Sequence, residues 1–422
     1  MSEQKGRIKV LVTTLGRSHF VYATSALIAA GVDACLFQGW VVKNPVTSWL
    51  VHIAAKILGR GKSFVYGFSL RNSPELEGRN IGDFFSEVVD TLAKYTIGRI
   101  NEVWYNRACK LGFLLHGWRM SHLLEKGDYN IAHIRSGFGR GGCIETAKRK
   151  GVRILVDHSA GAPQFIIEDV DGKEWGDWSF WWSVQRDCEA ADVLMVDCDF
   201  VKSTFLKYGY PEEKIRVVYM GLPSWFNGLK NWDEDLAGVG RSAEKPLRIA
   251  YTGVFAAHKG CHEFLAAVEK LSDAGVFFEV DAMGSVSVPS QDAERFPCAM
   301  KKINFRGHLP QTEMTEVMKG SHIFLFPSYS EGCARAAFEA MSMGLCVVCT
   351  YETGVPIVDG KNGYLIKKRD SDAIVEKICY LIDHPDKISV CGQEASKTLK
   401  KYTWEFYAEN VKKIYKELLG NI

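Results

Sequence analysis

Short runs of apolar and β-branched residues alternate with amphipathic stretches along most of the chain. An apolar run at residues 8–14 is followed by a helical stretch at 20–30 and by a second apolar run at 32–37. The same order returns further along the first half, at residues 131–136, 143–151 and 152–158. Continuously apolar strands alternating with helices predict a parallel sheet covered by helices on both faces.

The alternation stops at residues 221–246, a stretch rich in Gly, Asn and charged residues that is typical of an interdomain linker. It starts again with LRIAYTG at residues 247–253, and strand-like runs follow at 277–284, 303–307, 322–328 and 345–350. The pattern therefore predicts an α/β protein with two doubly wound sheets. Such sheets bind ligands at the carboxyl ends of their strands, so we expect a cleft between two facing domains.

Composition narrows the function classes. The 422 residues carry 52 Lys and Arg against 50 Asp and Glu, a net charge of +2 that gives no reason to expect a nucleic-acid partner. The longest uncharged runs are too short to span a membrane, and the first residues have no apolar core typical of an export signal. Twelve scattered cysteines lack the spacing of metal ligands, so we expect reduced thiols in a cytoplasmic protein without a required metal.

One motif stands out in the second half, at residues 322–344. It is consistent with a buried strand ending at Pro327, a polar turn, and a helix from about residue 332 to 343. Glu331 stands at the helix entrance, and Glu339 follows eight residues later. On one helix the two carboxylates would lie about 12 Å apart along the axis, which suits the two ends of an elongated ligand. The alternative is a helix-entry carboxylate and a solvated helix face.

A second motif lies upstream, where the strand at residues 247–252 leads through a loop of small residues to Lys259, just before the next helix. A lysine at a helix N-terminus combines an ammonium group with the positive end of the helix dipole, an arrangement that binds phosphate. A solvated lysine in a turn is the alternative.

These motifs together resemble the nucleotide-sugar-binding domain of retaining GT-B glycosyltransferases in the large family numbered four. The resemblance runs from Leu247 to Tyr415 and rests on the TG…KG loop, on RGHLP and on the E-x7-E pair within SEGCARAAFEAMSMG. In the first half, VRILVDHSAG and the segment around IRVVYMG also match, whereas residues 35–130 match more weakly. The resemblance implies the GT-B fold, in which two Rossmann-like domains face each other across a cleft. It implies an acceptor-binding domain at residues 1–228, a donor-binding domain at 229–400, and a final helix at 401–422 that returns to the first domain.

The resemblance also assigns roles to individual residues. It implies that Lys259 neutralises the donor diphosphate, that Glu331 binds sugar hydroxyls, and that Glu339 binds the ribose. It further places His158 opposite the transferred sugar. The remaining donor-binding residues that it implies are Gly253, Arg306, Gly332 and Cys333.

One position departs from the family. Arg usually follows the glycine of the phosphate loop, and this chain has Val254 there. Half of the usual phosphate clamp is therefore missing. Either His258, Arg306 or Arg335 takes its place, or catalysis is weak or absent.

The resemblance implies a hexosyltransferase that moves a sugar from a UDP- or GDP-sugar to a hydroxyl group, with retention of configuration. The acceptor would be a glycan or a lipid-linked intermediate in polysaccharide or glycoconjugate biosynthesis. We expect no cofactor and no metal, since the nucleotide-sugar is itself the substrate. Three alternatives stay open: a nucleotide-sugar epimerase of the same fold, an NAD-dependent oxidoreductase, and a non-catalytic nucleotide-sugar-binding protein, the last suggested by Val254.

The dehydrogenase alternative rests on Gly137, Gly139 and Gly142, which have G-x-G-x-x-G spacing between a strand and a helix. Asp157 follows at the end of the next strand. Against this interpretation, the motif lies in the middle of the domain rather than in its first βα unit.

Two helical segments, at residues 45–62 and 96–124, mix Trp and Leu with basic residues. Residues 40–126 hold 12 Lys and Arg against 7 Asp and Glu, a local excess that suits an anionic membrane surface. This pattern predicts a peripheral protein at the inner face of the membrane, and packing within the acceptor domain is the alternative. Elsewhere, the acidic pair Asp169 and Asp171 is typical of a solvated turn.

Overall fold

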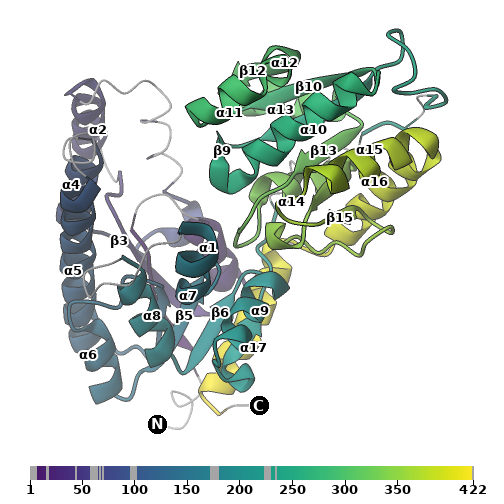
Figure 1. Ribbon diagram of the computed structural model, residues 1–422. Helices are drawn as coiled ribbons and strands as arrows, with labels where there is room; N and C mark the ends of the chain where they lie inside the picture. Colours follow the sequence, from purple (N-terminus) through teal and green to yellow (C-terminus); the bar gives the residue numbers. More distant parts are fainter. Residues whose placement is uncertain are drawn as a thin grey trace.

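The computed structural model describes residues 7–15, 19–42, 45–57, 65, 68, 71–95, 102–171, 180–222, 230–232 and 235–420. Its chain forms two lobes, each built on one large parallel sheet wrapped by helices (Figure 1). We call them the N lobe, built on a seven-stranded sheet, and the C lobe, built on a six-stranded sheet. The predicted α/β class with two doubly wound sheets is confirmed.

In the N lobe the strands follow the order β3-β2-β1-β4-β5-β6-β7, and every neighbouring pair is parallel. The strands are β1 (Lys9–Thr13), β2 (Asp33–Gln38), β3 (Asn80–Gly82), β4 (Ile131–Arg135), β5 (Arg153–His158), β6 (Val193–Val196) and β7 (Ile215–Val217). The helices are α1 (Phe20–Ala29), α2 (Pro45–Ile57), α4 (Phe84–Tyr95), α5 (Glu102–Lys126), α6 (Cys143–Arg149), α7 (Pro163–Phe165), α8 (Phe180–Ala190) and α9 (Asp199–Lys207). Short helical turns are η2 (Pro74–Leu76), η4 (Ile166–Asp171) and η5 (Glu212–Lys214).

In the C lobe the order is β12-β10-β8-β13-β14-β15, again parallel throughout. The strands are β8 (Leu247–Thr252), β10 (Phe278–Met283), β12 (Ile303–Gly307), β13 (Ile323–Phe326), β14 (Cys346–Thr350) and β15 (Tyr364–Ile366), with the small pair β9 (Phe255–Ala256) and β11 (Val286–Ser287) beside them. The helices are α10 (Cys261–Asp273), α11 (Ser290–Arg295), α12 (Pro297–Lys302), α13 (Gln311–Gly320), α14 (Arg335–Met343), α15 (Ser371–Asp383), α16 (Asp386–Leu399) and α17 (Trp404–Leu418). The short turns are η7 (Ala257–Lys259) and η8 (Tyr351–Thr353).

Each sheet starts in its middle and grows to both edges. The chain leaves β1 towards one edge and returns to β4 on its other side, and β8 and β13 are neighbours in the same way. The loops that follow two such strands diverge above the sheet and leave a crevice, which is where α/β proteins bind ligands. The loops after β8 and β13 carry Lys259 and Glu331 and therefore flank this point of the C lobe.

The last helix, α17, leaves the C lobe and lies against the N lobe (Figure 1). Its buried side chains Tyr407, Val411 and Tyr415 join the apolar cluster around Phe20 and Leu27 of α1. The hydroxyl of Tyr415 also meets Nδ1 of His133 on β4, at 2.6 Å. The helix thus fills one face of the N-lobe sheet and ties the end of the chain to its beginning.

Helix α5 packs unusually close to the glycine-rich loop at residues 137–142. A Cβ on Gly117 of α5 would lie 1.6 Å from the carbonyl oxygen of Arg140, and one on Gly141 would lie 2.3 Å from the carbonyl oxygen of Leu114. Backbone atoms cannot turn aside as a flexible side chain can. Glycine is therefore required on both sides of this contact.

We expect Gly117→Ala to lower the free energy of unfolding by about 1–3 kcal/mol, because the added methyl group forces two backbone segments apart. Denaturant unfolding of the purified protein measures this change. Gly320→Ala is the matched control: Gly320 is the last residue of α13, and a Cβ there meets no atom within 4 Å. Equal stability changes in the two variants would contradict this explanation of the glycine-rich loop.

Candidate functional site

Two loops of the C lobe meet at the carboxyl edge of its sheet. We call them the Lys259 loop (residues 253–260) and the Glu331 loop (residues 327–334). Gly260 has a φ of 74°, and a Cβ there would lie 2.1 Å from the carbonyl oxygen of Pro327. The backbone N–H of Tyr329 also donates to the carbonyl oxygen of His258, at 3.0 Å. The two loops therefore form one unit.

The side chains of Lys259 and Glu331 form an ion pair, Nζ with Oε1, at the meeting point of these loops. The hydroxyl of Ser328 donates to the same carboxylate oxygen, at 2.7 Å. Both side chains of the ion pair are largely buried. The structure thus brings together the two residues that the sequence singled out from separate motifs, and it fixes the Glu331 carboxylate with two donors.

The helix after this loop begins at Arg335, three residues later than predicted. The N–H groups of Glu331 and Ala334 donate to the carbonyl oxygens of Glu352 and Thr353, both at 2.9 Å. These bonds hold the segment in an extended form, so the predicted 12 Å separation along one helix does not apply. Ala334 at the N-cap offers no side-chain cap, which leaves the N-terminus of α14 suited to an anion.

Glu339 lies one turn into α14, and its side chain is only 8% exposed. Burial raises the pKa of its carboxyl group, and the nearby Arg335 acts in the opposite direction. The Nε atom of Arg335 donates to Oε1 of Glu339, at 2.7 Å. The alternative of a solvated helix face is therefore wrong for Glu339.

His158 ends strand β5 of the N lobe and is buried. Its Nε2 lies 3.1 Å from the carbonyl oxygen of Gly161, and its Nδ1 lies 2.8 Å from the hydroxyl of Ser136. Since a carbonyl oxygen only accepts, Nε2 carries the proton and Nδ1 accepts from Ser136. Burial lowers the pKa of His158 to about 4, so the imidazole is neutral at pH 7.

The N lobe touches the Glu331 loop directly. A Cβ on Gly332 would lie 2.3 Å from the carbonyl oxygen of Ser159, the residue after His158. The thiol of Cys198, at the N-terminus of α9, donates to the carbonyl oxygen of Gly332. Cys333, the next residue, is buried. The predicted residues His158, Gly332 and Cys333 therefore come from two lobes to one place.

Val254 is exposed at the position where the family has an arginine. Arg306 does not fill this gap. It lies on β12, two strands away from β8, and its Nε donates to Asp281 of β10 at 2.6 Å. Arg335 is better placed. It stands in the first turn of α14, directly after the Glu331 loop, and its side chain is 54% exposed.

The glycine fingerprint of the N lobe is occupied by the protein itself. The N–H groups of Gly137 and Gly139 donate to Oδ2 of Asp187, at 2.7 and 2.8 Å. Burial raises the pKa of Asp187 to about 7, although these two bonds act to lower it. A dinucleotide would need the same N–H groups for its pyrophosphate. This geometry argues against the dehydrogenase alternative, and the fingerprint is explained by the close packing of α5.

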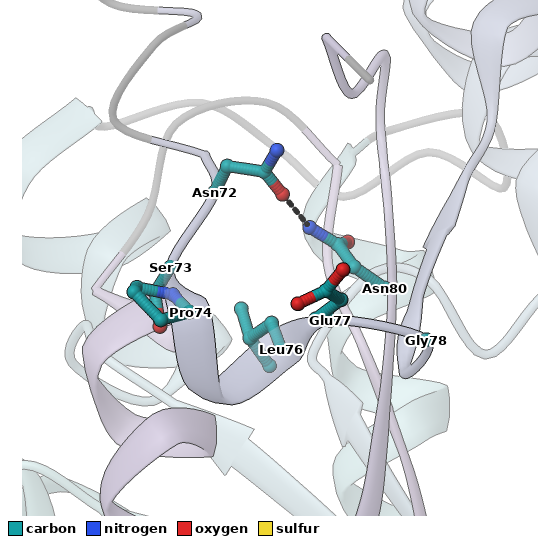
Figure 2. Close-up of a pocket in the computed structure, with 7 residues that line it drawn as sticks. All are labelled: Asn72, Ser73, Pro74, Leu76, Glu77, Gly78 and Asn80. Carbon is teal, nitrogen blue, oxygen red and sulfur yellow. Dashed lines mark hydrogen bonds between the residues drawn. The ribbon is translucent and has the colours of Figure 1, made fainter. Parts of the chain in front are cut away.

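An open pocket of about 460 Å³ lies at the edge strand β3, away from these residues (Figure 2). It is lined by Asn72, Ser73, Pro74, Leu76, Glu77, Gly78 and Asn80. The amide of Asn80 donates to Oδ1 of Asn72, at 3.1 Å. The pocket shares no residue with the predicted site.

Over the part of the chain that the structure describes, no group of three or more His, Cys, Asp or Glu side chains has the arrangement of a metal site. No helix in the described ranges has the length and apolar character needed to cross a membrane.

Comparison with known proteins agrees with the C-lobe geometry. Residues 246–384 match the family described as glycosyl transferases group 1. The D-inositol 3-phosphate glycosyltransferase of Corynebacterium jeikeium is 27% identical over 256 residues, which cover 56% of this chain and 59% of that protein. The putative colanic acid biosynthesis glycosyltransferase WcaL of Salmonella typhimurium is 25% identical over 229 residues, 50% of this chain and 53% of that protein.

Solved structures match over nearly the whole length. The structure of Anabaena HepE in complex with UDP and glucose aligns with a TM-score of 0.60 and 11% identity, covering 97% of this chain and 100% of that one. At such identity the likeness shows the fold alone, which is GT-B. The matches to the first curated relatives span between about a third and three fifths of their own length. The family match, over residues 246–384, lies in the C lobe.

Proposed function

We propose that the protein transfers a sugar from a nucleoside-diphosphate sugar to a hydroxyl group of a glycan or lipid-linked acceptor, with retention of configuration. The observation that carries this proposal is the Lys259–Glu331 pair, held where the loops after β8 and β13 diverge. The bound UDP and glucose of HepE support a UDP-hexose donor, and a GDP-sugar is the other candidate. The names of the two bacterial relatives support an acceptor from glycoconjugate or polysaccharide biosynthesis.

In the proposed complex, the donor diphosphate binds the ammonium group of Lys259, and the sugar hydroxyls donate hydrogen bonds to the Glu331 carboxylate. Backbone N–H groups at Gly332 and Cys333, with Gly253 on the facing loop, border the phosphates. Departure of the nucleoside diphosphate builds negative charge on these phosphates, so fixed cations and N–H groups lower the barrier. Ser328 stays on Glu331 and keeps its orientation while Lys259 changes partner.

Arg335 is proposed to supply the second cation in place of the missing arginine at Val254. Its position in the first turn of α14 adds its charge to the positive end of that helix. Glu339, its partner, would then bind the ribose hydroxyls. We assign acceptor binding to residues 1–228 and donor binding to residues 229–400, with the helix in 401–422 tying the two together.

His158 is proposed to orient the transferred sugar rather than to protonate it. A histidine whose pKa is about 4 is a neutral imidazole at pH 7 and so cannot act as an imidazolium acid. Its ring is fixed from both sides by Ser136 and Gly161. Because both ring nitrogens are bonded within the protein, the neutral imidazole would act as a rigid surface against which the sugar packs, close to the Glu331 loop.

We also propose that an anionic membrane surface holds the N lobe near a lipid-linked acceptor. Helix α4 is amphipathic with its polar side inward: Ser86, Glu87 and Asp90 are buried, as is Asp83 just before the helix. Large apolar side chains are exposed on α4 and on neighbouring α2 and α5, including Phe85 at 70%, Trp49 at 61% and Trp118 at 53%. We call this set the apolar edge: Trp49, Phe84, Phe85, Leu92, Leu111, Leu114 and Trp118. Figure 1 places the three helices at the side of the N lobe away from the C lobe.

The charges of this region favour an anionic surface. Of the seven acidic residues between positions 40 and 126, Asp83, Glu87 and Asp90 are buried. Among the basic residues of this region whose burial the structure describes, Arg71 is buried, where it pairs with Glu87. Within these described residues, burial removes more negative than positive charge from the surface. An apolar and basic face suits a membrane with anionic headgroups.

We expect Lys259→Ala and Glu331→Gln each to reduce transfer at least about tenfold without unfolding the protein, since each removes a contact made to the departing diphosphate or the sugar. Lys270→Ala is the control for the transfer assay, because Lys270 of α10 pairs with Asp372 in an exposed contact. Wild-type transfer in both site variants would refute the site.

Donor choice is tested by thermal unfolding with UDP, GDP, ADP, CMP or NAD. A ligand present at 100 times its Kd adds about 2.7 kcal/mol to the free energy of unfolding. Nucleotide binding without any transfer would support the non-catalytic alternative.

A second expectation concerns pH. The pKa of His158 lies below that of an unfolded histidine, 6.5, so the stability it contributes is complete above pH 6.5 and is lost as the pH falls to about 4. In His158→Gln, the fall in unfolding free energy over this range should be shallower by up to about 1.4 kcal/mol per pH unit. Denaturant unfolding at several pH values measures both proteins. Parallel pH profiles would show that His158 is not held neutral.

The membrane proposal is tested by cosedimentation with vesicles. Phe85→Ser and Trp118→Ser should each weaken binding to vesicles that contain an anionic phospholipid, and salt should weaken binding of the wild type. Phe277→Ser is the matched control, because Phe277 is an exposed phenylalanine of the C lobe. Absence of wild-type binding at low salt would rule the membrane surface out. Concentration-dependent self-association that Phe85→Ser abolishes would instead assign the apolar edge to a second copy of the chain.

A further inference from the structure

A cluster of charges joins the two lobes away from the Lys259–Glu331 pair. Asp169, in η4 of the N lobe, accepts from Nζ of Lys368 at 2.5 Å and lies 3.4 Å from Nη1 of Arg369. Arg369 also donates to the backbone carbonyl oxygen of Asp169. The predicted solvated turn is therefore wrong for Asp169, whose partners stand about 200 residues later in the chain.

Lys368 connects this contact to the Glu331 loop. Its side chain is 16% exposed, and its Nζ also lies 3.6 Å from Oε1 of Glu352. The carbonyl oxygen of Glu352 accepts the backbone N–H of Glu331, at 2.9 Å. One lysine thus stands between an aspartate of the N lobe and the residue that holds Glu331 in place.

Arg369 connects the same contact to the Lys259 loop. Its guanidinium group lies 4.6 Å from the ring centroid of Tyr329. The N–H of Tyr329 bonds to the carbonyl oxygen of His258, and its hydroxyl donates to Glu263 at 2.6 Å. Arg369 has a φ of 58°, a left-handed conformation that is uncommon outside glycine. This conformation is compatible with the observed contacts of adjacent residues 368 and 369 to Asp169, Glu352 and Tyr329.

We propose that Asp169, Lys368 and Arg369 form a latch that holds the lobes closed and positions both donor loops. All three are positioning residues, since none touches the Lys259–Glu331 pair itself. Closure of the free protein does not depend on the proposed function, whereas the effect on donor binding rests on it.

The electrostatics of the latch favour the closed form. Partial burial would raise the pKa of Asp169, but Lys368 and Arg369 hold it below its usual range. When the lobes separate, Asp169 loses both cations. The chain passes between the lobes near Leu222 and Tyr402, where the N–H of Leu222 donates to the carbonyl oxygen of Tyr402 at 2.9 Å. Rotation about these crossings would break the latch without unfolding either sheet.

The test compares Asp169→Asn and Lys368→Met with Lys367→Met. Lys367 is adjacent to Lys368 but its side chain is 82% exposed, which makes it the matched control. Small-angle X-ray scattering of the free proteins at low salt should give a larger radius of gyration for the two latch variants and no change for the control. The Kd for the diphosphate that binds the wild type, UDP or GDP, should rise about fivefold or more in the latch variants.

Kinetics separate positioning from general damage. In the latch variants Asp169→Asn and Lys368→Met, the donor KM should rise more than kcat falls. Lys368→Arg should keep both constants at wild-type values, because a guanidinium group can reach the same two carboxylates. A wild-type radius of gyration and wild-type nucleotide affinity in both latch variants would overturn the latch and leave the proposed function standing. A larger radius in both variants, with a wild type that binds no nucleoside diphosphate, would support the latch and overturn the proposed function.

Discussion

The site depends on one close backbone approach between the lobes. Gly332 stands so near the carbonyl oxygen of Ser159 that any larger residue would push the lobes apart. Because Glu331 and His158 are the chain neighbours of these two residues, this contact fixes how far His158 lies from the Glu331 loop. The Cys198 thiol on the carbonyl of Gly332 adds direction to the same contact. A side chain at position 332 would therefore separate the Glu331 loop of the C lobe from His158 of the N lobe.

The charged residues around this contact are paired within the protein. Lys259 pairs with Glu331, Arg335 with Glu339, and Lys368 with Asp169 and Glu352. Partly buried carboxylates without cations would be unstable, since desolvation disfavours their charged form. In the proposed complex, the donor phosphates would take over the cations Lys259 and Arg335. Sugar and ribose hydroxyls would then donate hydrogen bonds to the carboxylates that these cations leave.

Much of the fold could be predicted from the sequence, because buried parallel strands appear as short apolar runs. The strand and helix patterns each depend only on residues close together in the sequence. The E-x7-E pair and the lysine loop could also be found, since both lie within single βα units. Three features could not. The helix begins at Arg335 because Glu352 and Thr353 take the N–H groups of Glu331 and Ala334. The glycine fingerprint is filled by Asp187, about 50 residues later. Asp169 meets Lys368 across the lobes. Each depends on a contact that only the completed fold creates.

The polarity of α4 shows the same limit in another form. An amphipathic pattern tells that a helix has two faces but not which one turns inward, and ordinary packing would bury Phe84 and Phe85. Here the buried side meets polar partners instead. Asp83 accepts from Nδ1 of His116 at 2.8 Å and from Arg119 at 2.9 Å, while Glu87 pairs with Arg71. The other ring nitrogen of His116 lies 2.7 Å from the hydroxyl of Thr13, at the carboxyl end of β1. These contacts pair the buried charges of the inward polar face, and the apolar face of α4 turns outward. The network that reaches the first strand of the N lobe is thus also the reason why α4 presents an apolar surface.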